Sequence, residues 1–289
     1  MNKQLAIVDR EKFRKTYLNS ANDVLRFWTP SMQSEISRHN VGWREERTDF
    51  GGYLRHSELR YWVAFDLVRR TGPFASYCEV GGFFGAYPLT LRRLGIEVAM
   101  TEAPSYYSDS FSPLFAYLRQ EGVEIIDHDP FEQEPFVGRH FDVVSAMAVL
   151  EHYPHSQRRF LEFMRAIAAP NGRLYIEVPN IAFWPRRWAL LRGRTPLSPL
   201  EDIYQSEVPY LGHHHEYTMD ELHRLAALAE LRVIDEKQFN YSFVGPWTKR
   251  FISDPLLTLM SSRPSMRECL AVVLTPSADS MARGEGGHG

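Results

Sequence analysis

The chain has 289 residues, 44% of them hydrophobic, a length that allows one large domain or two small ones. Its formal net charge of −3 argues against a nucleic-acid-binding protein, and its two cysteines lie in apolar runs typical of packed thiols in a reducing compartment. The charged N-terminus lacks the apolar core of a signal peptide, and no apolar stretch is long enough for a membrane span, so we expect a cytoplasmic protein.

The first 72 residues predict a helical N-terminal cap. Charged and aromatic residues are mixed over 1–50, where Pro30 and Gly42 interrupt the helical pattern. Residues 54–70 carry apolar side chains at helical spacing, and a Thr-Gly-Pro sequence follows them. We therefore expect one well-formed helix over 54–70, packed before the first strand.

Short apolar runs then alternate with helical segments. We expect strands over 75–80, 96–101, 123–126, 141–147 and 173–178, and helices over 87–94, 111–120 and 156–168. Strands that alternate with helices form parallel βαβ units, so the pattern predicts an α/β fold with a doubly wound sheet across residues 73–276.

The regular alternation stops at residue 180. Residues 180–212 are rich in proline, arginine and tryptophan, and an insertion of this length is typical of a lid or binding segment. Beyond it we expect a helix over 219–229 and strands over 231–237 and 269–274. The Gly-rich tail, 277–289, is expected to be disordered.

A glycine-rich loop follows the first expected strand. Glu79 ends that strand, the glycines Gly81, Gly82 and Gly85 follow, and Glu102 ends the next strand about twenty residues on. Glycines let a backbone approach a ligand closely, and an acid at this place accepts hydrogen bonds from ribose hydroxyls. The pattern predicts a site for an adenosine-containing cofactor.

Several motifs in consistent order resemble the class I S-adenosylmethionine (SAM) dependent methyltransferases. They are Glu79-Val80-Gly81-Gly82-Phe83-Phe84-Gly85, Thr101-Glu102, Asp129, Phe141-Asp142-Val143-Val144, Val149-Leu150-Glu151-His152, Pro170-Asn171-Gly172-Arg173-Leu174 and His215-Glu216-Tyr217-Thr218-Met219-Asp220-Glu221-Leu222. The resemblance covers about residues 74–240. It implies a Rossmann-like sheet of seven strands whose last strand, 269–274, is antiparallel.

One residue departs from the motif of this family. Phe83 stands where the middle glycine of the loop is usual. Its side chain can point away while its backbone still approaches the ligand, so we expect a loop of different shape on the same fold.

The resemblance implies a SAM site made by residues at the strand ends, and Arg55, close to the helix before the first strand, is a further candidate beside it. The expected cofactor-binding residues are Arg55, Glu79, Gly81, Gly82, Phe83, Gly85, Glu102, Ala103, His128, Asp129, Pro130, Met147, Ala148 and Glu151. Glu102 would accept from the ribose, Asp129 (with Asp127 as its competitor) from the adenine amino group, Glu79 would lie at the amino end, and Arg55 would pair with the carboxylate.

Histidines provide the candidates for acid–base chemistry. His152 follows the fourth strand, where ligands bind in open α/β sheets, and its pKa range suits a general base toward a hydroxyl. His214 and His215 are the alternative catalytic or substrate-binding residues. We expect no metal ion, because the adjacent histidines of His213–His215 cannot all ligate one ion easily.

The expected reaction is O-methylation of a small molecule, a sugar or glycan, or a natural product, with N-methylation as the nearest alternative. The proline-rich insertion resembles that of relatives acting on such acceptors, and its arginines (Arg186, Arg187, Arg192 and Arg194) either hold an anionic substrate or form a solvated face. Two further alternatives stay open: an NAD(P)-dependent oxidoreductase, which uses a similar loop, and a non-catalytic binding protein, which Phe83 would favour.

Overall fold

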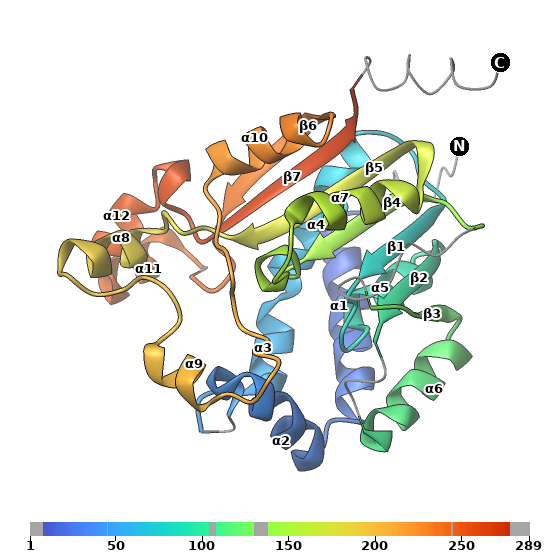
Figure 1. The fold of residues 1–289 in the computed structure, drawn as a ribbon, viewed down its shortest axis with the longest axis horizontal. Helices are drawn as coiled ribbons and strands as arrows, with labels where there is room; N and C mark the ends of the chain where they lie inside the picture. The colour runs from blue at the N-terminus through green and yellow to red at the C-terminus, as the bar shows by residue number, and fades with distance from the viewer. Residues whose placement is uncertain (1–7, 45, 104–107, 130–137, 244, 278–289) are drawn as a thin grey trace.

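A computed structural model describes residues 8–44, 46–103, 108–129, 138–243 and 245–277 of the protein. The strands are β1 (Ser76–Val80), β2 (Glu97–Glu102), β3 (Val123–Asp127), β4 (Phe141–Met147), β5 (Ala168–Pro179), β6 (Leu231–Phe239) and β7 (Cys269–Pro276). They form one seven-stranded sheet in the order β3-β2-β1-β4-β5-β7-β6 (Figure 1). β7 pairs antiparallel with β5 and β6, and the other pairs are parallel. The predicted fold, with its antiparallel last strand, is confirmed.

Helices cover both faces of this sheet. They are α1 (Arg10–Leu25), α2 (Pro30–His39), α3 (Phe50–His56), α4 (Glu58–Arg70), α5 (Ala86–Arg93), α6 (Ser112–Gln120), α7 (Gln157–Ala166), α8 (Trp184–Leu191), α9 (Leu200–Gln205), α10 (Met219–Leu228), α11 (Trp247–Ser253) and α12 (Pro255–Met260). Because side chains alternate along a strand, Tyr77 joins the core under α1, α4 and α5, whereas Cys78 joins the core under α7 and α10.

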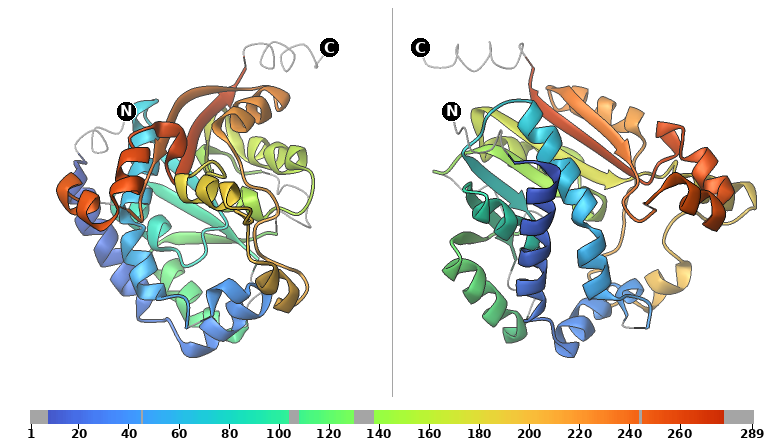
Figure 2. Two further views of the ribbon diagram at one scale, coloured as in Figure 1. Left: turned by 90° about the vertical axis from the view of Figure 1, so that its left-hand side faces the viewer. Right: turned by 180° about the vertical axis from the view of Figure 1, so that it is seen from behind.

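The N-terminal cap is helical as predicted, but its helices begin and end elsewhere than expected. Pro30 starts α2 instead of interrupting it, since proline suits the first turn and Thr29 caps the helix by accepting from the Met32 backbone N–H. The helix expected over 54–70 is two helices, α3 and α4, which meet at Ser57. Figure 2 shows α1 lying beside α3 and α4 behind the sheet.

Strand and helix bounds in the sheet region lie within a few residues of those expected. The largest difference is β5, which begins at Ala168, five residues before the expected 173–178. The Pro-Asn-Gly turn falls inside it, at a place where the register between β4 and β5 shifts. Of the tail expected to be disordered, 278–289 lies outside the described residues.

The insertion 180–212, where the regular alternation of strands and helices stops, contains the two helices α8 and α9. Two backbone hydrogen bonds attach its second half to the cap: Glu207 N–H to Arg38 O at 2.8 Å and Leu211 N–H to His39 O at 3.0 Å. Asp202 of α9 also pairs with Arg47 at 2.6 Å. The insertion and the cap therefore meet beyond the strand ends, with α9 beside α2 (Figure 1).

Within the described part of the chain, no helix combines the length and the apolar character that a membrane crossing needs.

Candidate active site

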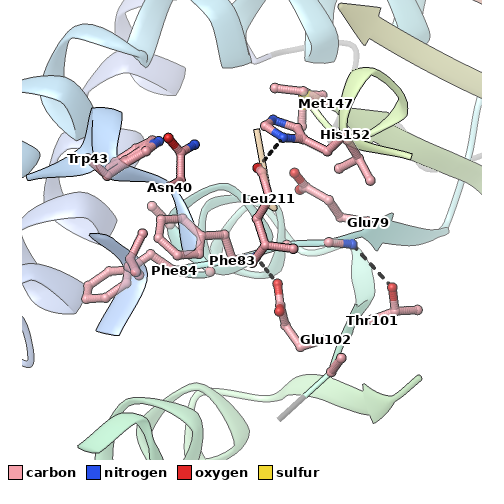
Figure 3. A pocket seen from close by; sticks show the side chains of 18 of the residues that line it. Asn40, Trp43, Glu79, Phe83, Phe84, Thr101, Glu102, Met147, His152 and Leu211 are labelled. Atoms are coloured by element: carbon pink, nitrogen blue, oxygen red, sulfur yellow. Dashed lines mark hydrogen bonds between the residues drawn. The ribbon is translucent and has the colours of Figure 1, made fainter. Parts of the chain in front are cut away.

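A pocket of about 310 Å³ lies at the carboxyl ends of β1, β2 and β4, where ligands bind in open α/β sheets (Figure 3). Most of the residues expected to bind the cofactor line it, together with one expected base. They are Glu79, Gly81, Gly82, Phe83, Gly85, Glu102, Ala103, His128, Asp129, Met147, Ala148 and His152. The sheet thus brings together residues that are up to 73 positions apart in the sequence.

The glycine loop needs its glycines for two different reasons. Gly81 and Gly85 have φ angles of 66° and 72°, in the left-handed region that other residues seldom adopt. A Cβ on Gly82 would lie 2.8 Å from the Met100 Cβ, so that position has no room for a side chain. The loop is held to the end of β2 by Gly81, whose N–H donates to Thr101 Oγ1 at 3.2 Å.

The structure shows how the loop accommodates Phe83 in place of the usual glycine. Phe83 also has a positive φ, 48°, which costs a non-glycine residue about 1–2 kcal/mol. Its ring meets Phe50 and Trp43 of the cap edge-on, at centroid distances of 5.8 and 6.2 Å. Such contacts contribute about 0.5–1.5 kcal/mol each and can offset the strain. Its backbone N–H donates to the Glu102 carboxylate (Figure 3), so the loop still lies against the acid at the end of β2.

The charged groups at the inner end of the pocket are Glu79 and Arg60. Glu79 is buried, and burial raises the pKa of its carboxyl well above the usual range, with the nearby Arg60 opposing the shift. Arg60 donates from Nε to Glu177 of β5 at 2.8 Å. Its Nη2 and the Oε2 atom of Glu79 are buried and have no hydrogen-bond partner within the described residues. A carboxyl group and a cationic donor, each with an atom that lacks a partner, are therefore available in one pocket.

The position of Arg55 corrects one expectation. Arg55 is exposed on α3 and does not line the pocket, whereas Arg60, one and a half turns on, does. Because Ser57 separates α3 from α4, the helical spacing counted through 54–70 does not give the face that meets the pocket.

The side of the pocket expected to bind adenine comes from the end of β3. His128 is buried and stacks on Phe163, with ring centroids 4.7 Å apart. Asp129 lines the pocket, whereas its competitor Asp127 is exposed. Pro130, expected beside them, lies outside the described residues.

Of the three histidines expected to be catalytic, His152 is the one that lines the pocket (Figure 3). Its Nδ1 lies 2.7 Å from the carbonyl oxygen of Leu211, which only accepts, so Nδ1 carries the proton and Nε2 carries the lone pair. Burial lowers the pKa of His152. A neutral imidazole with an available Nε2 suits a proton acceptor at neutral pH.

The expectation for His214 and His215 is not supported by their positions. Both are exposed and outside the pocket: His214 bonds to the Tyr210 carbonyl, and His215 lies 3.5 Å from Glu221. The histidine of this cluster that lies next to the pocket wall is instead His213, whose ring packs edge-on against His152 with centroids 4.7 Å apart. Adjacent residues of an extended segment face different ways, and the sequence does not show which one faces the sheet.

Glu151 lies behind the pocket and does not line it. It is fully buried, and burial raises the pKa of its carboxyl to about 8.

Two of the four arginines of the insertion make contacts within the protein: Arg186 pairs with Glu216, and Arg187 donates to the Ala182 carbonyl at 2.6 Å. These contacts argue against the prediction that all four arginines bind an anionic substrate.

The sequence analysis did not predict the opposite wall of the pocket. It is formed by cap residues and one insertion residue: Glu35, Ile36, His39, Asn40, Trp43, Tyr53, Leu54, Arg60, Tyr61 and Leu211. The cluster of aromatic residues in the first 62 positions was the available signal, but it carried no spacing that pointed to a site.

Comparison with known proteins identifies the family. Residues 49–236, more than half of the chain, match the family model for a methyltransferase domain. The 1,6-didemethyltoxoflavin-N1-methyltransferase of Burkholderia thailandensis, solved with S-adenosylhomocysteine, is similar in fold, with a TM-score of 0.51, 16% identity, and coverage of 86% of this chain and 88% of that one. The PH0226 protein of Pyrococcus horikoshii OT3 has a TM-score of 0.53 and 16% identity, covering 84% and 99%.

No curated protein matches the chain. The family match supports a methyltransferase and not the oxidoreductase or the non-catalytic alternative. The chain belongs to the methyltransferase family and is a class I SAM-dependent methyltransferase.

Proposed function

We propose that the pocket binds SAM with its amino-acid end between Glu79 and Arg60 and its adenosine between Glu102 and Asp129. The supporting observation is the pair of buried, unpartnered atoms, Glu79 Oε2 and Arg60 Nη2. Buried polar atoms are normally hydrogen-bonded, so a pair left open indicates a missing ligand. An ammonium group would pair with Glu79, and a carboxylate with Arg60.

The acceptor in this proposal is a hydroxyl group of a small molecule, a sugar or glycan, or a natural product. Bound SAM supplies a methyl group on a sulfonium, and its carbon–sulfur bond breaks as the acceptor oxygen bonds to the methyl carbon. His152 holds the hydroxyl and draws its proton away through Nε2. The cap, residues 1–72, and the lid, 180–212, exclude water from the acceptor site. The hydrogen bonds between the cap and the lid support this role.

The choice of oxygen over nitrogen rests on His152. A hydroxyl needs a proton acceptor to become a good nucleophile, whereas a neutral amine attacks with its own lone pair. N-methylation is the second candidate, because the Burkholderia thailandensis enzyme, named as an N1-methyltransferase, has the same fold. We place the reaction in the cytoplasm, since the two buried cysteines are unbridged and fit a reducing compartment.

The experiment is an acceptor screen with SAM that measures S-adenosylhomocysteine release and then locates the new methyl group by NMR. Hydroxyl-bearing sugars, nucleotide sugars and phenolic compounds form one set, and primary and secondary amines form the other. Turnover on a hydroxyl with an O-methyl product supports the proposal. Turnover on amines alone, with an N-methyl product, would replace it by the second candidate.

A further inference from the structure

We propose that Glu151, His152 and His213 bind a divalent transition-metal ion beside the pocket. The sequence favoured no metal, because three adjacent histidines cannot easily share an ion. The structure draws the three donors from two segments instead: the short 3-10 helix after β4 (Leu150–His152) provides Glu151 and His152, and the segment directly after the insertion provides His213. The inference deepens the proposed function at the same site, and it rests on that function only for the nature of the acceptor.

The geometry of the three side chains suits a single ion. One ligand atom of each residue lies within 4.8 Å of the other two. His152 Nε2 is 4.0 Å from Glu151 Oε1, too far for a hydrogen bond between them. Ligands that bind one ion at about 2.1 Å lie roughly 3–4 Å from each other, so a small inward movement of the three side chains completes the site.

Both histidines are already oriented as metal ligands usually are. His152 Nδ1 is 2.7 Å from the Leu211 carbonyl oxygen, and His213 Nδ1 is 2.7 Å from Glu216 Oε1. Glu216 is in turn paired with Arg186. Metal-binding histidines typically donate one ring N–H to a carbonyl or a carboxylate, which leaves the other nitrogen for the ion. In both rings that nitrogen is Nε2.

Glu151 provides the second, independent observation. It has no solvent exposure, and neither of its carboxylate oxygens has a hydrogen-bond partner among the residues that the structure describes. Buried polar oxygens are normally hydrogen-bonded or bound to a metal, whether the carboxyl group is charged or neutral. The charges of Arg60 and Arg186 act on Glu151, but Arg60 is paired with Glu177 and Arg186 with Glu216. A bound cation would supply the missing partner.

The donor set selects the class of ion. Two imidazoles and one carboxylate suit Mn²⁺, Fe²⁺, Co²⁺ or Zn²⁺, whereas Mg²⁺ prefers oxygen ligands. Three protein ligands leave a coordination position open, and His152 places it at the pocket wall. If an ion were bound, His152 would hold it through Nε2 and would no longer be the base; the ion would lower the pKa of the acceptor hydroxyl, and the released proton would pass to solvent water.

The test is titration of untagged, chelator-treated protein with Co²⁺ in the absence of SAM and acceptor, followed by visible absorption. We expect saturation at one equivalent, displacement by Zn²⁺ and no effect of millimolar Mg²⁺. Glu151→Gln and His213→Gln should weaken Co²⁺ binding at least 100-fold, whereas the neighbouring His214→Gln and His215→Gln should bind as the wild type does. Circular dichroism checks the fold of each variant.

Three outcomes would overturn the proposal: no saturable Co²⁺ binding by the wild type, unchanged binding in His213→Gln, or loss of binding in His214→Gln. The first would make Glu151 and His152 a metal-free acid–base pair. Titration with S-adenosylhomocysteine is independent of this result, so failure of the metal site and failure of the SAM site are distinguishable.

Discussion

The two sides of the pocket are built in different ways. The strand-end wall, formed by Glu79, Gly81, Glu102, Asp129 and His152, comes from backbone that the sheet fixes, with acids at the ends of hydrogen-bonded strands. The cap wall, formed by Asn40, Trp43, Tyr53 and Arg60, belongs to short helices that reach the sheet through side chains. We therefore expect cofactor binding to depend on the sheet and on Arg60, and acceptor choice to depend on the other residues of the cap wall and on the lid.

Phe83 connects the two walls. Its backbone belongs to the glycine loop and bonds to Glu102, while its ring packs on Phe50 and Trp43. A glycine there would relax the backbone and lose that link. The departure from the family motif therefore couples the cofactor loop to the cap.

The largest expected effect is a loss of turnover, without a loss of cofactor binding, when His152 of the strand-end wall is replaced. His152→Ala should lower kcat by about 10²–10⁴-fold, the usual range for loss of an acid–base group, because the acceptor proton is no longer drawn away. Affinity for S-adenosylhomocysteine should stay within about twofold, a change well under 1 kcal/mol. Steady-state kinetics and calorimetry check this, with the exposed His215→Ala as control. Full turnover by His152→Ala would remove this residue from the reaction.

The next effect tests the ribose contact. Glu102→Ala should weaken S-adenosylhomocysteine binding by about 10–100-fold, because hydrogen bonds to a charged group contribute about 1.5–3 kcal/mol. Glu97→Ala is the matched control, an exposed glutamate at the other end of β2. Calorimetry measures both variants. Equal affinities for the two would place the ribose elsewhere.

A smaller effect follows from the raised pKa of Glu79. Below that pKa the free protein holds a proton on Glu79, and this proton must leave before the carboxylate pairs with the ligand's ammonium group. Affinity for S-adenosylhomocysteine should therefore increase with pH, by up to about tenfold per unit, and level off above the raised pKa.

Calorimetry from pH 6 upward, in two buffers of different ionisation enthalpy, detects both the trend and the released proton. Glu79→Gln should flatten the pH profile. A wild-type profile that is already flat would argue that Glu79 does not meet the ammonium group.

The smallest effect concerns the contact between the lid and the cap. Asp202→Ala removes the ion pair with Arg47, worth about 1 kcal/mol at a part-buried position, so the acceptor KM should rise about fivefold. S-adenosylhomocysteine affinity should not change. Asp220→Ala, which breaks an exposed pair with Arg224, is the control. Weaker cofactor binding in Asp202→Ala would contradict the division between the two walls.

Sequence patterns predicted the sheet and the strand-end wall because both follow local rules. Alternating apolar runs gave the strands, and the glycines and acids that end them, such as Gly81 and Glu102, gave the pocket. Arg60 and His213 were missed for a different reason. Their orientation depends on a helix break at Ser57 and on the path of the insertion, which are set by tertiary contacts that sequence spacing does not encode.

The central claim is that Glu79 and Arg60 recognise the two charges of the cofactor's amino-acid end. The most direct test is a calorimetric comparison of S-adenosylhomocysteine with 5′-methylthioadenosine, which has the same nucleoside but no amino-acid end. We predict that S-adenosylhomocysteine binds at least tenfold more tightly, since two charge-assisted contacts each contribute about 1.5 kcal/mol or more. Equal affinity for the two compounds would contradict the account.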